Sequence, residues 1–380
     1  MGGNPLRRFI HEWQTNSHVR LSVIAALLVA GAGFVWLGVF IAIKNQRGQT
    51  VTTPQVHKID IDMESVEDID TDLNEDIVPR LVDGVLVDAD YAYMQPIGIM
   101  IENAAFGGVR PQDGLNSAQI VYELVVEGGI TRLMAIFASN EMPEKIGPVR
   151  SARPTFLEFI SEFDGLYGHA GGSPESLQAI DGLQIKDLSA LGADSRFFYR
   201  DSTRVAPHNL FTSDELLNLA KRDKTLDNQE IKFDVWNFKE DEKKDSAFEE
   251  EKYIHIDFGS GPLYEVKYIY NYEQNSYERY NGGEPHKDAN DDKIIMAKNV
   301  VVQIVPPAIP AGEKGRVNFD VTGSGDAYIA IDGKVSEAKW EKPDRLSRIQ
   351  FYTLDDELIE FNRGTTWISI LPETGSVDYN

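Results

Sequence analysis

The spacing of apolar residues changes across the charge-dense segment Lys239–Glu251. Before it, short apolar runs alternate with segments whose apolar residues recur at helical spacing and end at glycine or proline. After it, the apolar runs are short, β-branched and aromatic, and Asp332-Gly333 is a hairpin signal. The pattern predicts an α/β (or α+β) N-terminal domain and a mainly-β C-terminal domain.

Individual elements can be placed by the same reasoning. We expect helices at Ser117–Glu127, Pro154–Phe163, Pro174–Ile180 and Ser213–Lys221, the last one capped by Ser213. We expect strands in the N-terminal domain at Ile97–Ile101, Ile130–Ser139 and Leu166–Ala170. In the C-terminal domain we expect strands at Tyr253–Phe258, Val266–Tyr272, Val300–Val305, Ala327–Ile331, Arg348–Thr353 and Thr366–Ile370.

An unbroken apolar run, Leu21–Ile43, precedes these domains. At 1.5 Å per residue, a helix of this length spans a bilayer core. A cleaved signal peptide is the alternative, because Ala30-Gly31-Ala32 fits a cleavage site, but the apolar run would then continue beyond the cut as far as Ile43. The slight excess of basic residues before the run predicts a cytoplasmic N-terminus, residues 1–20, and an extracytoplasmic C-terminal part. The chain is therefore expected to be a single-pass protein of the cytoplasmic membrane.

Residues 44–90 are predicted to be a disordered tether. Asp60–Asp76 carries nine acidic residues and no basic one, and such a run repels itself and stays extended. The remaining boundaries follow from the change in pattern: an N-terminal domain at 91–238, a charged linker at 239–252 and a C-terminal domain at 253–380.

Charge and composition exclude several classes of protein. The formal net charge is −24, which argues against binding to nucleic acid, because phosphate recognition needs a basic surface. There is no cysteine, so disulfides, thiolate metal sites and a cysteine nucleophile are excluded. Neither a cofactor motif nor diagnostic spacing of metal ligands is present, and we expect no cofactor and no metal.

Three polar motifs with adjacent glycine or proline lie in the N-terminal domain, within 127–132, 147–154 and 199–209. Arginine beside such residues is aimed by the backbone rather than by core packing. Arginine can grip a carboxylate with two parallel hydrogen bonds, so we expect these side chains to surround one anion-binding cleft. The candidate ligand-binding residues are Arg110, Arg132, Arg150, Arg153, Arg200, Arg204 and Asn209. The alternative is an internal ion-pair network, with Glu123, Glu127, Asp201 or Asp164 as the acidic partners.

Candidate catalytic residues lie in these motifs or between them. His169 and His208 are the histidines of the predicted N-terminal domain, and Asp201 and Glu127 are the candidate carboxylates. If the histidines converged with a carboxylate, general acid–base chemistry would follow. A structural, hydrogen-bonded histidine is the alternative for His169.

Together, these motifs resemble the YerB-like family (DUF3048 domain) of bacterial envelope proteins. The matching residues run from Pro96 to Pro372 and include Ile97–Asn103, Arg110–Leu115, Glu127–Arg132, Ile146–Pro154, His169–Ser173, Arg200–Asn209, Tyr277–Tyr280 and Pro285-His286. The resemblance implies an N-terminal and a C-terminal domain, an envelope location and no established reaction. Several members of the family are lipoproteins, whereas this chain has an apolar span and no cysteine for lipid attachment.

Two classes of function fit these observations. The first is a noncatalytic extracytoplasmic module that binds a cell-envelope ligand, such as a peptidoglycan fragment, or an envelope protein through an Arg/His-rich cleft. The second is an enzyme acting on a cell-wall component, with His169 and His208 as acid–base residues. A purely structural scaffold is a third possibility. Because no catalytic template is matched, we favour the binding module.

Overall fold

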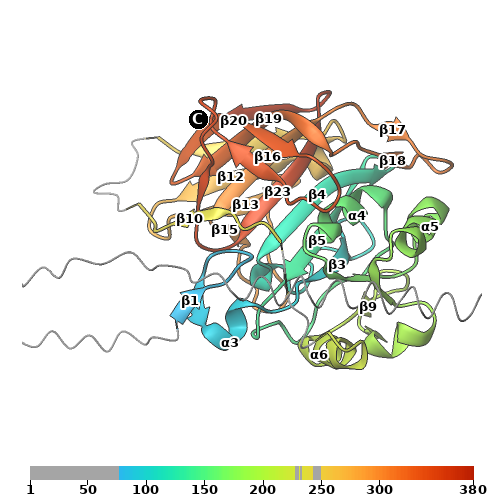
Figure 1. Cartoon of the computed structure of the whole chain (residues 1–380). Coiled ribbons are helices and arrows are strands. Elements are labelled where there is room, and N and C mark those ends of the chain that lie inside the picture. The colour runs from blue at the N-terminus through green and yellow to red at the C-terminus, as the bar shows by residue number, and fades with distance from the viewer. Residues whose placement is uncertain (1–76, 227–230, 232, 243–249) are drawn as a thin grey trace, which may run out of the picture. The chain divides into compact units, whose positions relative to one another are not determined.

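The computed structural model describes residues 77–226, 231, 233–242 and 250–380, which are mostly β-structure (Figure 1). The four α-helices of this part are short: α3 (Ala89–Ala92), α4 (Pro154–Ser161), α5 (Pro174–Gly182) and α6 (Asp214–Asp223). Single 3-10 turns occur at η1 (Leu115–Ser117), η2 (Ala193–Phe197) and η3 (Pro262–Tyr264). No helix in the described ranges is long and apolar enough to span a membrane. The expected anchor, Leu21–Ile43, lies outside these ranges.

A ten-stranded sheet joins the N-terminal and C-terminal parts of the chain. Its strands, in spatial order, are β21 (Gln350–Tyr352), β20 (Lys334–Lys342), β19 (Gly323–Ile331), β16 (Asn299–Val305), β23 (Thr366–Pro372), β4 (Ile120–Glu127), β5 (Ile130–Phe137), β3 (Ile97–Glu102), β6 (Leu166–His169) and β7 (Lys186–Ser189). The N-terminal and the C-terminal part of the chain each supply five neighbouring strands of this sheet. The halves meet where β23 pairs in parallel with β4, with Thr366 opposite Ile120 and Ser369 opposite Glu123.

A six-stranded antiparallel sheet comes entirely from the C-terminal part. It contains β14 (Glu284–Pro285), β13 (Ser276–Asn281), β12 (Val266–Asn271), β11 (Tyr253–Asp257), β24 (Ser376–Tyr379) and β15 (Met296–Ala297). Four two-strand ladders complete the fold: β1 (Ile77–Pro79) with β2 (Leu86–Asp88), β8 (Tyr199–Arg200) with β9 (Leu210–Phe211), β10 (Asn237–Lys239) with β22 (Glu360–Asn362), and β17 (Ile309–Pro310) with β18 (Val317–Asn318).

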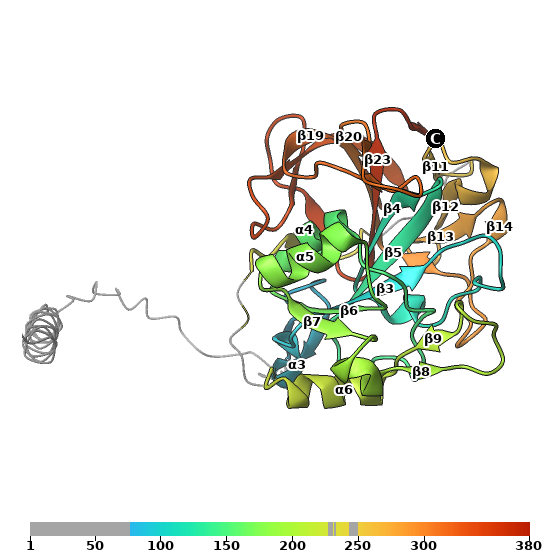
Figure 2. The same ribbon diagram turned by 90° about the vertical axis from the view of Figure 1, so that its right-hand side faces the viewer.

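Strand β4 lies between two layers. Successive side chains of a strand point to opposite faces. Tyr122 points to the helical side, where its ring stacks on Phe159 of α4 at 4.4 Å between centroids. Its neighbour Glu123 points to the other side and forms an ion pair with Arg279 of β13. In Figure 2, α4 and α5 accordingly lie on one side of β4 and β5, and β12 and β13 lie on the other. The central strands are therefore buried on both faces.

This double burial explains one wrong prediction. Residues 117–127 were expected to be a helix, but they form η1 and strand β4. A strand that is covered on both faces has no polar face, so its sequence loses the alternation that distinguishes a strand from a buried helix. The other expected helices are confirmed: α4 begins at Pro154, α5 begins at Pro174, and the Ser213 side chain accepts a hydrogen bond from the Leu216 amide at the start of α6. The Asp332-Gly333 hairpin joins β19 to β20.

Two predictions about the organisation of the chain need correction. Residues 77–90 were assigned to the disordered tether, yet they form β1, β2 and the start of α3. The two domains were expected to be distinct packed units that could share an interface. The shared region is larger than an interface, because residues from both belong to one hydrophobic core and each part supplies a contiguous half of one sheet. Because β23 pairs with β4, the hydrophobic cores of the N-terminal and C-terminal parts are continuous. The N-terminal part is thus less helical than expected, and the mainly-β character extends through the whole folded unit.

Candidate functional site

Backbone hydrogen bonds bring the sequence motifs together at the end of β3. The Glu102 amide donates to Pro148 O at 2.9 Å, and the Arg150 amide donates to Met100 O at 2.9 Å. On its other side the same segment meets β9, directly after the loop that carries His208, since the Val149 amide donates to Leu210 O at 2.7 Å. The sequence 146–150 therefore lies between the polar end of β3 and the loop that carries His208.

Glu102 connects two of the predicted site residues. Arg150 Nη2 lies 3.0 Å from Glu102 Oε1, and His208 Nδ1 lies 2.9 Å from Glu102 Oε2. The Glu102 side chain is 5% exposed, whereas those of Arg150 and His208 are 25% and 15% exposed. The buried Glu102 carboxylate thus pairs with two partly exposed side chains. Glu102 was not among the predicted site residues, although a charged residue directly after the apolar run Ile97–Ile101 was a usable signal.

A cavity of about 380 Å³ opens beside Arg150. Arg200 also lines it, and Arg200 Nη1 donates to Asn209 Oδ1 at 2.6 Å. Most of the remaining wall is apolar and comes from Val149, Ala170, Ala190, Leu191, Phe198, Pro207 and Leu210. Within the described part of the chain, the buried Nε of Arg150 has no hydrogen-bond acceptor. The cavity therefore presents two guanidinium groups above a mainly apolar wall.

A second group of charges surrounds Glu127. Arg153 Nη2 and Arg132 Nη2 lie 2.7 Å and 2.8 Å from Glu127 Oε1. Arg132 Nη1 also donates to Ser151 O at 3.0 Å. Burial raises the pKa of the Glu127 carboxyl, but Arg132 and Arg153 together lower it below its ordinary value. Burial lowers the pKa of Arg132 to about 10. The guanidinium groups of Arg132 and Arg153 therefore form ion pairs with Glu127 inside the protein.

A third group lies around Asp113 and Asp201. Lys145 Nζ bridges the two carboxylates, at 3.3 Å from Asp113 and 2.6 Å from Asp201. Hydrogen bonds from Lys145 and Thr203 hold the pKa of Asp201 well below its ordinary value. Arg204 Nη2 pairs with Asp113 at 2.8 Å, and its guanidinium also donates to the carbonyls of residues 108, 109 and 111. Arg204 therefore links the loop between β8 and β9 to the segment 108–113.

The side chains of Arg110 and His169, the two remaining candidates, form hydrogen bonds with partners outside the groups described above. Arg110 donates to Asn103 Oδ1 at 3.0 Å and to Leu263 O at 2.9 Å, and it lines a different cavity of about 220 Å³. The His169 ring is fully buried, with Nδ1 2.7 Å from Gly171 O and Nε2 2.6 Å from Asp187 Oδ1. His169 therefore has the hydrogen bonding of a structural histidine.

The predicted site residues do not gather around one cleft. Among the cavities described above, only Arg150 and Arg200 share one, and the other arginines are bound within the protein. The internal ion-pair account holds for Glu127, but the expected roles of the other acids differ: Glu123 pairs with Arg279, Asp164 with Lys186 and Asp201 with Lys145. His169 and His208 contact different carboxylates. No cluster of three or more potential metal-ligating side chains occurs in the ranges that the structure describes.

Comparison with known proteins agrees with this architecture. The family model described as "Protein of unknown function (DUF3048) N-terminal domain" matches residues 83–227, and the model of the DUF3048 C-terminal domain matches residues 254–368. A relative from Bacillus subtilis (strain 168), named "Putative lipoprotein YerB", is 28% identical over 282 residues, which cover 73% of this chain and 82% of the relative. The crystal structure of the YerB protein from Bacillus subtilis matches with a TM-score of 0.69 and 26% identity, and the match covers 79% of this chain and 99% of that one.

Proposed function

Since this chain belongs to the DUF3048 family, we propose that it is a membrane-anchored, extracytoplasmic binding protein of the cell envelope. The relative that is named a lipoprotein supports an envelope location, because a lipid anchor attaches a protein to a membrane surface. In this chain Leu21–Ile43 takes the place of that anchor and spans the cytoplasmic membrane once. The folded residues then lie on the extracytoplasmic side.

The ligand is the free carboxylate end of a peptidoglycan peptide, and it binds in the cavity lined by Arg150 and Arg200. The observation that carries this proposal is the incomplete hydrogen bonding of the Arg150 guanidinium. Its pairing with Glu102 uses Nη2, no acceptor engages its Nη1 within the described residues, and its side chain is one-quarter exposed and lines the cavity. An incoming carboxylate would supply that acceptor, and charge-assisted hydrogen bonds are the stronger ones.

The shape of the cavity narrows the choice of ligand. Its volume of about 380 Å³ is suited to a small molecule or a peptide end rather than to a protein surface. Ala170 and Ala190 in the wall leave room for small apolar side chains such as alanine methyl groups. Arg150 is paired with Glu102, but no carboxylate pairs with Arg200 among the described residues. Arg200 therefore leaves a local positive charge on a chain whose net charge is −24, and this charge attracts an anionic group.

The catalytic alternative receives less support. A general acid or base must reach the proton that it transfers. The His169 side chain is fully buried, and its partner Asp187 differs from the partner of His208. We therefore assign His169 a structural role and place His208 in the support of Glu102 rather than in chemistry.

The test is binding of a purified muropeptide with a free terminal carboxylate, measured by calorimetry on the full chain in detergent. The matched ligand carries an amide in place of that carboxylate. We expect amidation to weaken binding by about tenfold or more, which corresponds to about 1.4 kcal/mol. Arg200→Ala should weaken binding to a similar extent.

Arg222→Ala is the control, because Arg222 is exposed on α6 and does not line the cavity. Equal binding of the acid and the amide would overturn the proposal, and so would equal effects of the two arginine variants. Analysis of the products after incubation tests the enzymatic alternative in the same samples. Cleavage that depends on His208 would favour an enzyme.

A further inference from the structure

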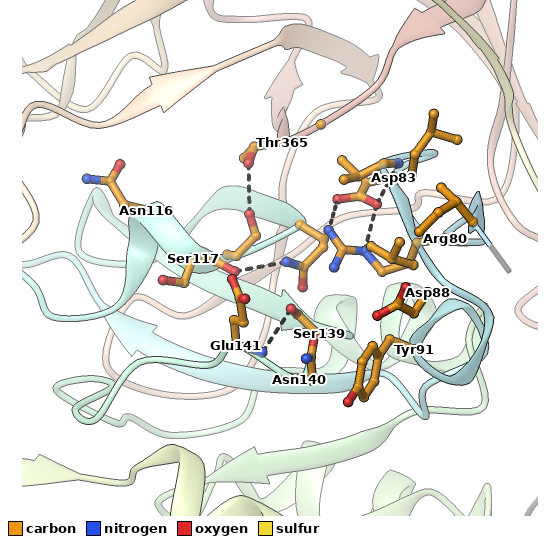
Figure 3. A pocket seen from close by; sticks show the side chains of 17 residues that line it. Arg80, Asp83, Asp88, Tyr91, Asn116, Ser117, Ser139, Asn140, Glu141 and Thr365 are labelled. Atoms are coloured by element: carbon orange, nitrogen blue, oxygen red, sulfur yellow. Dashed lines mark hydrogen bonds and ion pairs between the residues drawn. The ribbon is translucent and has the colours of Figure 1, made fainter. Parts of the chain in front are cut away.

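A larger cavity, of about 660 Å³, lies on a part of the fold that the sequence did not single out. Figure 3 shows that segments far apart in the chain surround it: the β1–β2 hairpin with α3, the segment 116–119, the loop after β5 and residues 364–365. None of the predicted arginine or histidine site residues lines it. The cavity is therefore distinct from the one beside Arg150.

Part of the wall is fixed by internal hydrogen bonds. Arg80 forms a two-point pair with Asp83, from Nε to Oδ1 at 2.8 Å and from Nη2 to Oδ2 at 2.7 Å, and both side chains are buried. The Gln119 side chain donates to Ser117 O and accepts from the Ala138 amide. Because these polar groups are paired with each other, they give the cavity a preorganised shape without needing a ligand.

Other polar groups of the wall remain available. No hydrogen bond or ion pair engages the side chains of Asp88, Ser117, Asn140 or Glu141 within the described residues. Figure 3 shows Asp88 and Tyr91 on one side of the cavity, and Ser117 and Glu141 on the opposite side. Tyr91 is 37% exposed, so part of its ring is open to a ligand. Carboxylate, amide, hydroxyl and aromatic groups thus line one cavity.

We propose that this cavity binds a neutral or amino sugar of an envelope glycan. Carboxylate and amide oxygens accept hydrogen bonds from sugar hydroxyls, and a ring such as that of Tyr91 packs against the apolar C–H face of a sugar. The volume falls within the range of about 300–1,000 Å³ that is usual for small-molecule sites. Arg80 is neutralised by Asp83, so Asp88 and Glu141 leave the cavity acidic, and acidic sugars are repelled.

The probe is fully N-acetylated chitotetraose, a neutral oligosaccharide without a carboxylate, titrated into the full chain in detergent and followed by calorimetry. Because this probe lacks the group that the Arg150 cavity needs, the result is independent of the proposed carboxylate site. We expect saturable binding that Tyr91→Ala weakens by at least about tenfold. Asp88→Asn should also weaken it, whereas an oligogalacturonate of the same length should not bind.

Two matched controls come from α3 and the residue that follows it. Tyr93→Ala and Asp90→Asn alter exposed residues of the same types that do not line the cavity, and they should leave binding unchanged. The inference is overturned if chitotetraose does not bind, if the acidic oligosaccharide binds as well, or if the control variants weaken binding as much as Tyr91→Ala. Thermal unfolding of each variant shows whether a loss of binding reflects a loss of folding.

Discussion

Arg279 of β13 and Glu123 of β4 form an ion pair with both side chains fully buried, with 2.6 Å between Nη2 and Oε2. Glu123 also accepts hydrogen bonds from Asn103 and Thr131, and Arg279 Nε donates to the ring of His286. Polar residues from the N-terminal and C-terminal parts therefore meet in one enclosed network. Burial, reinforced by the Arg279 and Arg110 guanidiniums, lowers the pKa of His286 well below its ordinary value, so this ring is neutral.

Removing one partner of this pair should destabilise the whole folded unit. Glu123→Gln leaves Arg279 charged, buried and without its counter-ion, and we expect a loss of about 3–5 kcal/mol in the free energy of unfolding. The measurement is urea denaturation of the fragment 73–380. Asp292→Asn makes the same chemical change in the exposed pair with Lys287 and should cost no more than about 1 kcal/mol. Similar losses in the free energy of unfolding for both variants would show that the Glu123–Arg279 pair does not stabilise the contact between the N-terminal and C-terminal parts.

A pair of neighbouring glycines tests the position of His208. Gly107 and Gly108 have positive φ values of 72° and 67°, so alanine at either position should cost about 1–2 kcal/mol. A Cβ at position 107 would lie 2.8 Å from His208 Nε2, whereas a Cβ at position 108 meets nothing within 4 Å. We expect Gly107→Ala to lose about 1 kcal/mol more, because the bond to Glu102 is disturbed. The His208 NMR signals should shift in that variant only. Equal shifts in both variants would place the ring elsewhere.

Acid should weaken the anchoring of the β19–β20 hairpin. Burial raises the pKa of the Asp332 carboxyl, but hydrogen bonds from Lys239, Asn362 and Asn275 outweigh it and bring the pKa below its ordinary value of 3.8. A depressed pKa in the folded state adds stability above the unfolded value, and this stability is lost as the pH falls through the folded value. Asp332→Asn should abolish this part of the acid dependence in denaturation curves. Because asparagine tolerates a positive φ, the hairpin itself is preserved. An unchanged pH profile would contradict the assignment.

Replacing His169 should affect folding rather than binding or chemistry. His169→Ala removes a fully buried ring and two hydrogen bonds, and we expect a loss of about 2–3 kcal/mol in the free energy of unfolding. His255→Ala is the control, since the His255 side chain is one-third exposed and contacts Glu265 at 3.2 Å, and its cost should be small. Muropeptide binding by the folded His169→Ala protein should be unchanged. Loss of an activity without loss of stability would restore the catalytic interpretation.

Local sequence signals located many elements because their causes are local. Pro154 and Ser213 mark helix starts through backbone geometry and capping, and Asp332-Gly333 marks a hairpin through its turn conformation. The candidate site was less predictable. Arg132 and Arg153 stand in motifs like that of Arg150. Nothing in their local sequence reveals that the first two are buried and pair with Glu127, while Arg150 pairs with Glu102 and is one-quarter exposed at a cavity.

The sequence by itself determined the membership of the family, most helix and strand positions and the mainly-β character of the C-terminal part, because each of these depends on residues close together in the chain. Only the tertiary structure decided that β23 pairs with β4, that residues 120–127 form a doubly buried strand rather than a helix, and that residues 77–90 help to enclose a cavity. These features depend on which distant segment covers a given face. Burial on both faces removes the alternation that would have identified β4, and the pairing of a charge depends on a neighbour that the local sequence does not name.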